Sequence, residues 1–423
     1  MNNSTPAEFA LVVPNWFDGE RRHRDGPFTI RVNDGLVAEI AAGDHGAALE
    51  RRGLAVERGG FLMPGLVDAH AHLFLDGAPT DAKLRAEHLK QPLDKLIDAA
   101  RASARQARAC GVTLVRDAGD RHGINNRIRA EALSGTSAAG GLPRVRSGGL
   151  GVKRARRYGA FMATDVSDEE SIAQSVTRLA ADNDEIKVIL TGIIDFDAGA
   201  VTDAPQFTLA EAELIVRTAR AAGRTTFAHC SGEQGLAIAA AAGIGSIEHG
   251  FFMNRATLET MAANGVAWTP TFCPVHFQWS HPEAVGWSPQ TVGNLRRILD
   301  DHARHLRLAH ELGVTLLLGT DAGSMGVEHG RAMLEEIERY LDAGLTLDAT
   351  LKAATSAARR HFGDARPTLA VGAPLDALLL ARSPFDAASH AASIAALRAP
   401  LKTWVREAER ATPGRRPPDS DNC

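Results

Sequence analysis

The sequence has few cysteines, no long apolar run and no marked excess of charge of either sign. Its 423 residues include only four cysteines, at positions 110, 230, 273 and 423. Because these cysteines are far apart and show no paired spacing, they predict neither a disulfide framework nor a zinc site built on thiolates. We therefore expect reduced cysteines, as in a cytoplasmic protein.

The charge balance and the lack of apolar segments exclude two further classes of partner. The 47 basic and 51 acidic residues are well mixed and give a net charge of -4, so no electrostatic feature favours nucleic acid or an anionic membrane surface. The amino terminus lacks the basic and apolar blocks of a signal peptide, and the longest run of small apolar residues, 236–245, is too short to span a bilayer. The sequence predicts a cytoplasmic location, and it leaves open whether the chain forms a homo-oligomer.

The overall composition is that of a globular protein with a large core. Apolar residues make up 44% of the chain and charged residues 23%, which are ordinary values for a globular protein. Because a chain of 423 residues exceeds the length at which a single core stops growing, we expect one large domain and a smaller one.

Two regions differ in their pattern of apolar residues. Residues 8–60 predict short strands joined by turns, with one turn at Asn33–Gly35. After residue 62, apolar strands alternate with helical stretches, which is typical of parallel βαβ units. Two helices are expected to begin with capping boxes, at Ser167 and Thr208. The strand candidates are 65–72, 112–117, 144–147, 186–190, 225–229, 245–249, 266–271 and 315–321, and the clearest helices are 94–110, 167–182, 208–222 and 289–312.

These eight strand candidates predict an α/β fold, a closed (β/α)8 barrel with a small β-sandwich. Residues 369–380 return to strand character and are expected to rejoin the amino-terminal strands. We therefore predict that residues 1–61 and 368–411 form the sandwich from both ends of the chain and that residues 62–367 form the barrel. The tail 412–423 is rich in Pro, Arg and Asp, and its composition predicts disorder.

An apolar strand that ends in two histidines is the most informative feature of the sequence. His70 and His72 are two residues apart, and on a β-strand such residues point to the same side, so that both imidazoles can hold one ion. The pair also stands at the carboxyl end of its strand, where an α/β barrel places its chemistry. A pair of solvated polar side chains is the structural alternative.

Four further strands carry side chains of the same kind. Lys187 lies on the fourth strand, and His229, His249 and Asp321 close the fifth, sixth and eighth. If the barrel closes, all of them meet His70 at one mouth, and such groups are costly to bury without a partner. The alternatives are a lysine that reaches solvent, hydrogen-bonded core histidines and a carboxylate that caps a turn.

With these residues in place, the chain resembles the amidohydrolase superfamily of metal-dependent hydrolases. The resemblance extends over most of the chain, in the order in which the family has its motifs. The matching segments are 64–72, 186–192, 228–232, 246–250 and 318–323, with further similarity in 329–356 and 371–376.

The resemblance implies a role for each residue. His70, His72 and Asp321 would hold one divalent ion, with zinc as the first choice, and His229 and His249 would hold a second. Lys187 would bridge both ions as a carbamate formed with carbon dioxide, a reaction that needs the neutral amine. A metal-bridging hydroxide would attack the substrate, and Asp321 would act as acid and base. The implied reaction is cleavage of an amide-type C–N bond in a small molecule, namely an N-acyl amino acid, a dipeptide or a cyclic amide.

Two alternatives to this function remain open. One is a mononuclear deaminase or imidazolone-type hydrolase of the same superfamily, in which Lys187 is unmodified. The other is a catalytically silent metal-binding protein.

Substrate-binding residues are expected in two loops. The basic loop after the third strand offers a guanidinium fork for a substrate carboxylate, although a solvated loop is the alternative. The loop after the seventh strand contains His276, which lines the pocket or belongs to an ordinary packed loop. The candidates are Arg154, Arg156, Arg157, Tyr158 and His276.

Overall fold

A computed structural model describes residues 7–134 and 141–405 of the chain. The tail 412–423, for which disorder is predicted, and Cys423 lie outside the described residues. The predicted boundary between residues 61 and 62 falls inside a strand, β7 (Phe61–Pro64), and the domain boundaries stay a prediction.

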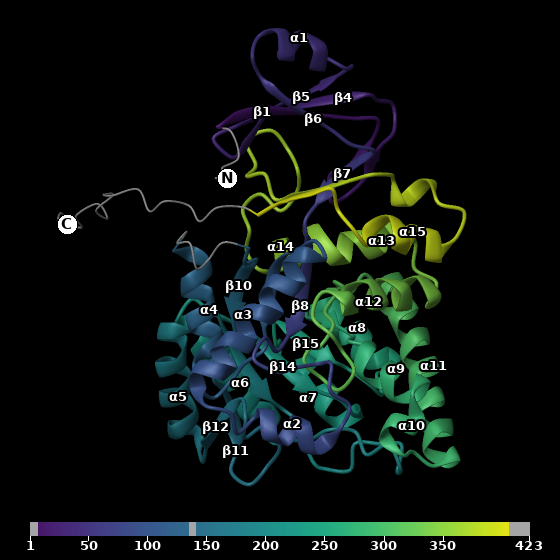
Figure 1. Ribbon diagram of the computed structural model, residues 1–423. Helices are drawn as coiled ribbons and strands as arrows, with labels where there is room; N and C mark the ends of the chain where they lie inside the picture. Colours follow the sequence, from purple (N-terminus) through teal and green to yellow (C-terminus); the bar gives the residue numbers. More distant parts are fainter. Residues whose placement is uncertain (1–6, 135–140, 406–423) are drawn as a thin grey trace, which may run out of the picture.

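The larger part of the molecule is a barrel of parallel strands surrounded by helices (Figure 1). Seven of the eight predicted barrel strands are present, and they pair in parallel from β8 to β10 and from β13 to β16. Two short strands that the sequence did not predict, β11 (Gly151–Arg154) and β12 (Ala163–Val166), extend the sheet beside β13. The seven strands are β8 (Leu66–Ala71), β9 (Val112–Asp117), β10 (Arg144–Ser147), β13 (Glu185–Ile189), β14 (Thr225–Cys230), β15 (Ser246–His249) and β16 (Ala267–Thr269).

The eighth barrel segment, 315–321, closes the ring without forming a regular strand. The backbone N–H of Leu317 donates to the carbonyl of Trp268 at 2.8 Å, and that of Ala69 donates to Leu318 at 2.9 Å. The segment therefore bonds to β16 on one side and to β8 on the other. This closure confirms the predicted (β/α)8 class, although regular pairing was expected here.

Helices cover the outside of the barrel and join its strands. The capping box at Thr208 is confirmed, because its hydroxyl and the carboxylate of Glu211 each bond the other residue's backbone. The capping box predicted at Ser167 is wrong, since Asp168 caps that helix instead. The helices of more than eight residues around the barrel are α3 (Leu93–Ala109), α4 (Ile124–Leu133), α5 (Glu169–Asp182), α6 (Leu209–Ala221), α7 (Glu233–Ala242), α8 (Arg255–Asn264), α11 (Pro289–Glu311) and α12 (Arg331–Asp342).

Shorter helices and helical turns occur both around the barrel and, in the case of α1, on the sandwich (Figure 1). They include a π-helical turn, whose widened backbone accepts a hydrogen bond from Leu318 of the closing segment through the carbonyl of Ala353. The short helices are α1 (Gly46–Arg51), α2 (Ala82–His88), α9 (Cys273–Ser280), α10 (Pro282–Val285), α13 (Leu347–Lys352), the π-turn (Ala353–Ala357), α14 (Ala358–His361), a 3-10 turn (Pro384–Asp386) and α15 (His390–Leu397).

Two small sheets form a sandwich beside the amino end of the barrel (Figure 1). One has the order β5-β4-β1-β6 and the other β18-β17-β7-β2-β3. As predicted, the carboxyl-terminal part returns to the amino-terminal strands, because β17 pairs with β7. One buried apolar cluster joins both sheets and includes Leu11, Ile30, Leu62 and Leu379. The strands are β1 (Glu8–Val13), β2 (Trp16–Phe17), β3 (Arg22–His23), β4 (Phe28–Asn33), β5 (Leu36–Ala42), β6 (Ala55–Arg58), β17 (Ala377–Leu380) and β18 (Lys402–Trp404).

Two expectations from composition concern cysteines and membranes. Cys110, Cys230 and Cys273 are free thiols. Within the described part of the chain, no helix is both long enough and apolar enough to cross a bilayer.

Candidate metal centre

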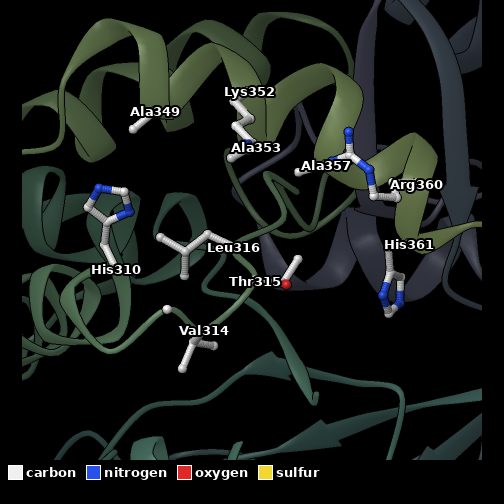
Figure 2. A pocket seen from close by; sticks show the side chains of 11 residues that line it. His310, Val314, Thr315, Leu316, Ala349, Lys352, Ala353, Ala357, Arg360 and His361 are labelled. Carbon is white, nitrogen blue, oxygen red and sulfur yellow. The ribbon is translucent and has the colours of Figure 1, made fainter. Parts of the chain in front are cut away.

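A large cavity lies at the amino end of the barrel. It has a volume of about 430 Å³ between the start of the closing segment 315–321 and the helices α13 and α14 (Figure 2). Its basic residues Lys352 and Arg360 each pair with Glu20, at 2.6 Å. This cavity is distant from the predicted ligands, so volume alone does not identify the functional site.

A smaller cavity of about 230 Å³ lies at the carboxyl end, where the predicted ligands meet. Loops after the strands supply most of its wall, and those loops are largely apolar. Of the predicted site residues, it is lined by His72, Tyr158, Lys187, His229, His249 and Asp321.

Three of the predicted ligands form a compact cluster beside this cavity. One ligand atom from each of His70, His72 and Asp321 lies within 4.8 Å of the others. The Oδ1 atom of Asp321 is 3.6 Å from Nε2 of His70 and 3.7 Å from Nε2 of His72. It is the single cluster of at least three such side chains among the described residues, and it could hold a divalent ion.

The other two histidines continue the same cluster. The imidazole of His249 lies 5.0 Å from that of His70, centre to centre, and 4.6 Å from that of His229. The four imidazoles therefore form a continuous row, from His72 through His70 and His249 to His229. The structure brings together all five of the predicted His and Asp ligands.

Unusual backbone conformations position some of these side chains. His249, Thr271 and Asp321 have φ angles of 67°, 51° and 54°, in the left-handed region that side-chain-bearing residues rarely occupy. His249 is the last residue of β15, Thr271 lies two residues after β16, and Asp321 ends the closing segment 315–321. At His249 this turn breaks the alternation of the strand, and Glu248 and His249 can therefore both serve the same site.

Hydrogen bonds fix the orientation of three imidazoles. Nδ1 of His70 bonds to Oε2 of Glu248 at 2.7 Å, Nδ1 of His72 to the carbonyl of Gly119 at 3.1 Å, and Nδ1 of His249 to the hydroxyl of Thr271 at 2.8 Å. An acceptor at Nδ1 places the ring proton there and leaves Nε2 with a lone pair.

Two ring nitrogens of the four histidines are buried without a hydrogen-bond partner among the described residues. Nε2 of His70 and Nε2 of His229 are inaccessible and form no hydrogen bond. Leaving a buried polar atom unpaired costs free energy, so such atoms need an explanation. A divalent ion bound by these nitrogens accounts for both, and imidazole and carboxylate are ligands that zinc and related metals accept. The residues present therefore fit a metal centre.

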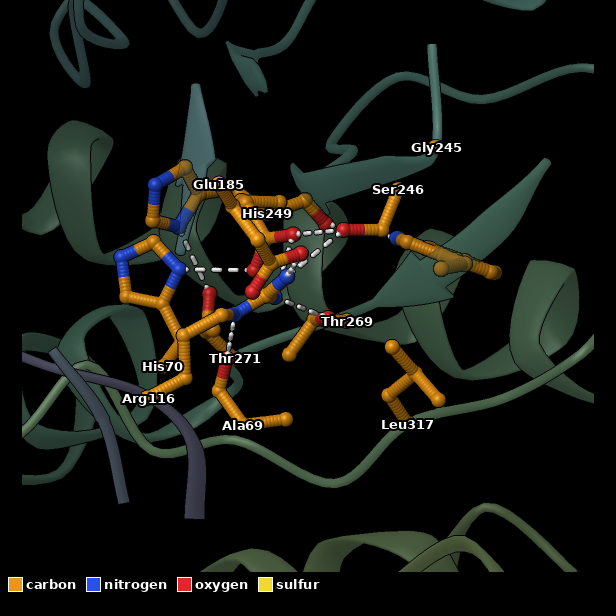
Figure 3. A network of polar contacts seen from close by, with 12 residues as sticks. Ala69, His70, Arg116, Glu185, Gly245, Ser246, His249, Thr269, Thr271 and Leu317 are labelled. Carbon is orange, nitrogen blue, oxygen red and sulfur yellow. Dashed lines mark hydrogen bonds and ion pairs between the residues drawn. The ribbon is translucent and has the colours of Figure 1, made fainter. Parts of the chain in front are cut away.

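A buried ionic network lies next to His70 (Figure 3). Arg116 is fully buried, and its Nη2 donates to Oε1 of Glu248 at 2.6 Å while its Nε donates to the carbonyl of Ala69 at 2.6 Å. Nη1 of Arg116 is 3.7 Å from Glu185. Because Glu248 also bonds His70, this network connects the barrel interior to the metal cluster and holds the imidazole in place.

Burial and charge keep the four imidazoles neutral. Burial and then the charge of Lys187 lower the pKa of His72 and the pKa of His229 to about 3. The pKa of His70 also lies well below its usual value, mainly through burial and Lys187. For His249, burial comes first and the neighbouring His229 second, and the pKa is again strongly lowered. A neutral imidazole is the form that ligates a metal ion.

Lys187 is almost completely enclosed, with 1% of its surface exposed. Its ammonium group lies 4.8 Å from the centre of the Phe227 ring, and no described carboxylate forms an ion pair with it. Burial lowers the pKa of Lys187, whereas burial raises the pKa of Asp321, and the two groups influence each other. The lowered pKa gives Lys187 a larger share of the neutral amine than a solvated lysine has at the same pH.

The residues predicted to bind substrate separate into two groups. Tyr158 lines the cavity, with its ring 5.0 Å from that of His229. Arg154, Arg156 and Arg157 do not line it. His276 does not line it either, and its Nε2 pairs with Arg339 at 2.9 Å in a separate surface pocket.

Several functional residues were missed from the sequence. Glu248 and Arg116 meet across 132 positions of the chain, and Glu248 and His70 across 178. A charged residue within an otherwise apolar barrel strand was the available signal, because such a charge must find a partner inside. The partner itself could not be named from spacing.

Comparison with known proteins agrees with this geometry. A family model described as the amidohydrolase family matches residues 61–406. An uncharacterized protein of Mycobacterium tuberculosis is 31% identical over 329 residues, which cover 77% of this chain and 80% of that protein. An ochratoxinase of Aspergillus niger is 25% identical over 348 residues, which cover 77% of this chain and 71% of the relative.

Solved structures show the same fold. The A. niger ochratoxinase structure superposes with a TM-score of 0.75 at 20% identity, covering 94% of each chain. A Xaa-Pro dipeptidase with methionine bound in its active site gives a TM-score of 0.75 at 20% identity, covering 93% of this chain and 97% of that one. At these identities the likeness concerns the fold alone.

Proposed function

The chain belongs to the amidohydrolase family, and from that premise we propose that it is a two-metal hydrolase that cleaves an amide-type C–N bond in a small molecule. The observation that carries the proposal is the convergence of four neutral imidazoles, Lys187 and Asp321 on one cavity. A related dipeptidase and an ochratoxinase among the similar proteins support an amide as the bond cleaved.

The proposed ligands divide into two sets. His70, His72 and Asp321 would hold one ion, and His229 and His249 a second, with zinc as the first choice. Divalent ions bound there would supply Lewis-acid chemistry, acidifying a water molecule and polarising the scissile carbonyl. The buried ring nitrogens of His70 and His229 support this assignment, because they have no other partner.

Lys187 is proposed to bridge the two sets. Its neutral amine would add to carbon dioxide, forming a carbamate and releasing one proton, and the two new oxygens would face both groups of ligands. The enclosure of Lys187 favours the neutral amine that this reaction needs.

Asp321 is proposed to move protons. Its carboxylate lines the cavity, and its Oδ2 accepts a hydrogen bond from the hydroxyl of Ser324 at 3.1 Å. That bond orients the group, so that it can take a proton from the attacking water and deliver one to the departing nitrogen. Without this delivery an amine is a poor leaving group.

Metal counting together with activity screening tests the proposal. Protein loaded with Zn²⁺ and freed of excess metal is expected to contain two ions per chain and to hydrolyse members of a panel of N-acyl amino acids, dipeptides, cyclic amides and simple neutral amides. Fully loaded protein that cleaves no member of the panel would refute the proposed hydrolysis.

A matched pair of lysine variants isolates the bridge. Lys187→Ala is expected to lose activity and one of the two ions, whereas Lys352→Ala, in the cavity at the opposite end of the barrel, should change neither. If Lys187→Ala kept both ions and full activity, the bridging role would be wrong.

A one-metal hydrolase is the second candidate, because the tight cluster of His70, His72 and Asp321 is complete without the other histidines. It would be a mononuclear deaminase or imidazolone-type hydrolase with unmodified Lys187. The same metal count separates the two: one ion per chain in fully active protein favours this candidate.

A further inference from the structure

The wall of the catalytic cavity is almost uncharged. Among the described residues that line it, Lys187 and Asp321 are the only ones with a charged side chain, apart from the histidines. Both belong to the proposed metal centre. The remaining wall is mainly apolar and includes Leu75, Phe161, Met162, Ile194, Phe251 and Val275.

Two arginines of the basic loop near the cavity are engaged by residues outside the cavity wall. Arg154 donates from Nη1 to the carbonyl of Val166 at 3.1 Å, and its Nη2 pairs with Glu211. Arg157 donates to the carbonyl of Ala204. These contacts tie the loop to the segment before α6, and neither guanidinium faces the cavity.

The guanidinium of Arg85, which lies near the site, is also occupied by hydrogen bonds within the protein. Arg85 interacts electrostatically with Asp321, but its Nη1 donates to the carbonyls of Asp76 and Pro79, and its Nη2 donates to the carbonyl of Gly323 at 2.8 Å. These bonds brace the loops around the mouth of the cavity, and they leave Arg85 engaged by backbone oxygens.

The rim of the cavity is apolar as well. Ile193 lines the cavity although 61% of its surface is exposed. Phe196 also lines it and packs edge-on against Trp287, with ring centres 6.0 Å apart. Tyr158 and Phe161, which also line the cavity, pack edge-on with ring centres 6.1 Å apart. Such rings favour a flat apolar group between them.

We propose that the substrate is a neutral amide with an aromatic or similarly flat apolar group and without a free carboxylate beside the scissile bond. The inference rests on the proposed amide hydrolysis. Against the wall outside the proposed metal centre, a carboxylate would lose its hydration without meeting a guanidinium or ammonium of the described lining, which is costly. An aromatic group would instead bury apolar surface against the wall, which is favourable.

Two amides that differ only in the carboxylate test the proposal. N-benzoylphenethylamine and N-benzoylphenylalanine share the scissile bond and both rings. With metal-loaded protein, kcat/KM for the neutral amide is expected to be at least about tenfold higher, because an uncompensated charge costs more than about 1.4 kcal/mol. An equal or higher value for the carboxylate-bearing amide would overturn the inference while leaving the proposed hydrolysis intact.

A rim variant makes the test independent of the choice of amides. Ile193→Arg introduces a guanidinium at an exposed position of the rim, where the fold tolerates a long side chain. It is expected to raise the ratio of kcat/KM for the carboxylate-bearing amide to that for the neutral one at least about fivefold, as expected for a new charge-assisted contact.

Leu133→Arg is the matched control. Leu133 on α4 is 54% exposed and does not line the cavity, so this substitution should leave the ratio unchanged. An unchanged ratio in Ile193→Arg would show that charge at the rim does not select the substrate, against the inference. Failure of both amides and of the whole panel would instead count against the proposed function.

Discussion

The barrel has a cavity at each end, and the two cavities differ in how their polar groups are satisfied. At the amino end, Glu20 holds both Lys352 and Arg360. At the carboxyl end, Lys187 has no ion pair with a described carboxylate, and Nε2 of His70 and Nε2 of His229 have no hydrogen-bond partner among the described residues. The larger cavity is therefore the one whose charges are already paired.

The difference shows which property indicates a functional site. At the amino end, His361 also has an unpartnered ring nitrogen, but no cluster of metal-type ligands surrounds it within the described ranges. At the carboxyl end, unpaired nitrogens, a carboxylate and left-handed backbone at three strand ends occur together. Several costly features in one place indicate function better than the volume of a cavity.

The largest expected effect is the loss of activity on removing the carboxylate of Asp321, the proposed acid and base. Asp321→Asn is expected to lower kcat about 10²–10⁴-fold, because the amide can neither accept nor deliver the proton. Steady-state assays on the best amide of the panel measure this. Glu20→Gln, at the opposite cavity, is the control and should stay near the wild-type kcat. A variant at Asp321 with more than about a tenth of that kcat would disprove the role.

The next largest effect is expected in the free energy of unfolding, when a buried arginine and a surface arginine are each removed. Arg116→Met leaves Glu185 and Glu248 buried without their shared cation, and we expect a loss of about 3–5 kcal/mol in the free energy of unfolding. Arg360→Met breaks a surface pair with Glu20 and should cost at most about 1 kcal/mol. Urea titrations followed by circular dichroism compare the variants. Equal losses of unfolding free energy in the two variants would show that the buried network contributes no more stability than a surface ion pair.

A smaller effect is expected at the carboxylate that orients His70. Glu248→Gln keeps the shape of the side chain but weakens its bond to Nδ1, and metal affinity should fall about 10–100-fold. Competition with a fluorescent chelator, at a temperature where all variants are folded, measures this affinity. Glu211→Gln, in the capping box of α6, is the control. Identical affinities for all three proteins would count against a role of Glu248 in metal binding.

The smallest effect is a pH dependence of stability at Glu336. This carboxylate of α12 accepts the backbone N–H groups of Phe272 and Cys273, at 2.9 Å and 3.1 Å. Burial raises its pKa from 4.5 to about 7. The folded state therefore binds a proton more tightly than the unfolded state, and the stabilisation by that proton is complete below about pH 4.5 and is lost as the pH rises through about 7.

The difference between wild type and Glu336→Gln isolates this effect. From about pH 6 to about pH 8 the wild-type protein should lose about 1 kcal/mol relative to the variant, because one unit of pKa is worth about 1.4 kcal/mol. Urea titrations at both pH values measure the difference. A constant or oppositely signed difference would contradict the raised pKa.

The barrel could be predicted from the sequence because its strands are apolar and buried on both faces, so that their limits coincide with turn signals. The residues at the strand ends, such as His70 and Asp321, followed from the same pattern. The irregular closing segment 315–321 was not foreseen, because its bonds go partly to a π-helical turn. At Ser167 the competing cap Asp168 is the adjacent residue, and spacing did not distinguish the two.

The partners of the site were less predictable than the site itself. Arg116 and Glu248 meet only because the barrel closes, and local patterns carry no information about contacts over 132 positions. The direction of Arg154 likewise depends on Glu211 and Val166, which lie on other elements. Long-range pairing of this kind follows from tertiary structure alone.

The ion-binding groups and the cavity wall come from different parts of the chain. The predicted metal ligands lie on the barrel strands and at their ends. Loops such as 192–196 and 158–162 contribute much of the cavity wall. Libraries confined to those two loops can therefore sample new specificities without touching the reactive centre. If the proposed hydrolysis is borne out, the protein is for this reason a convenient starting scaffold for directed evolution.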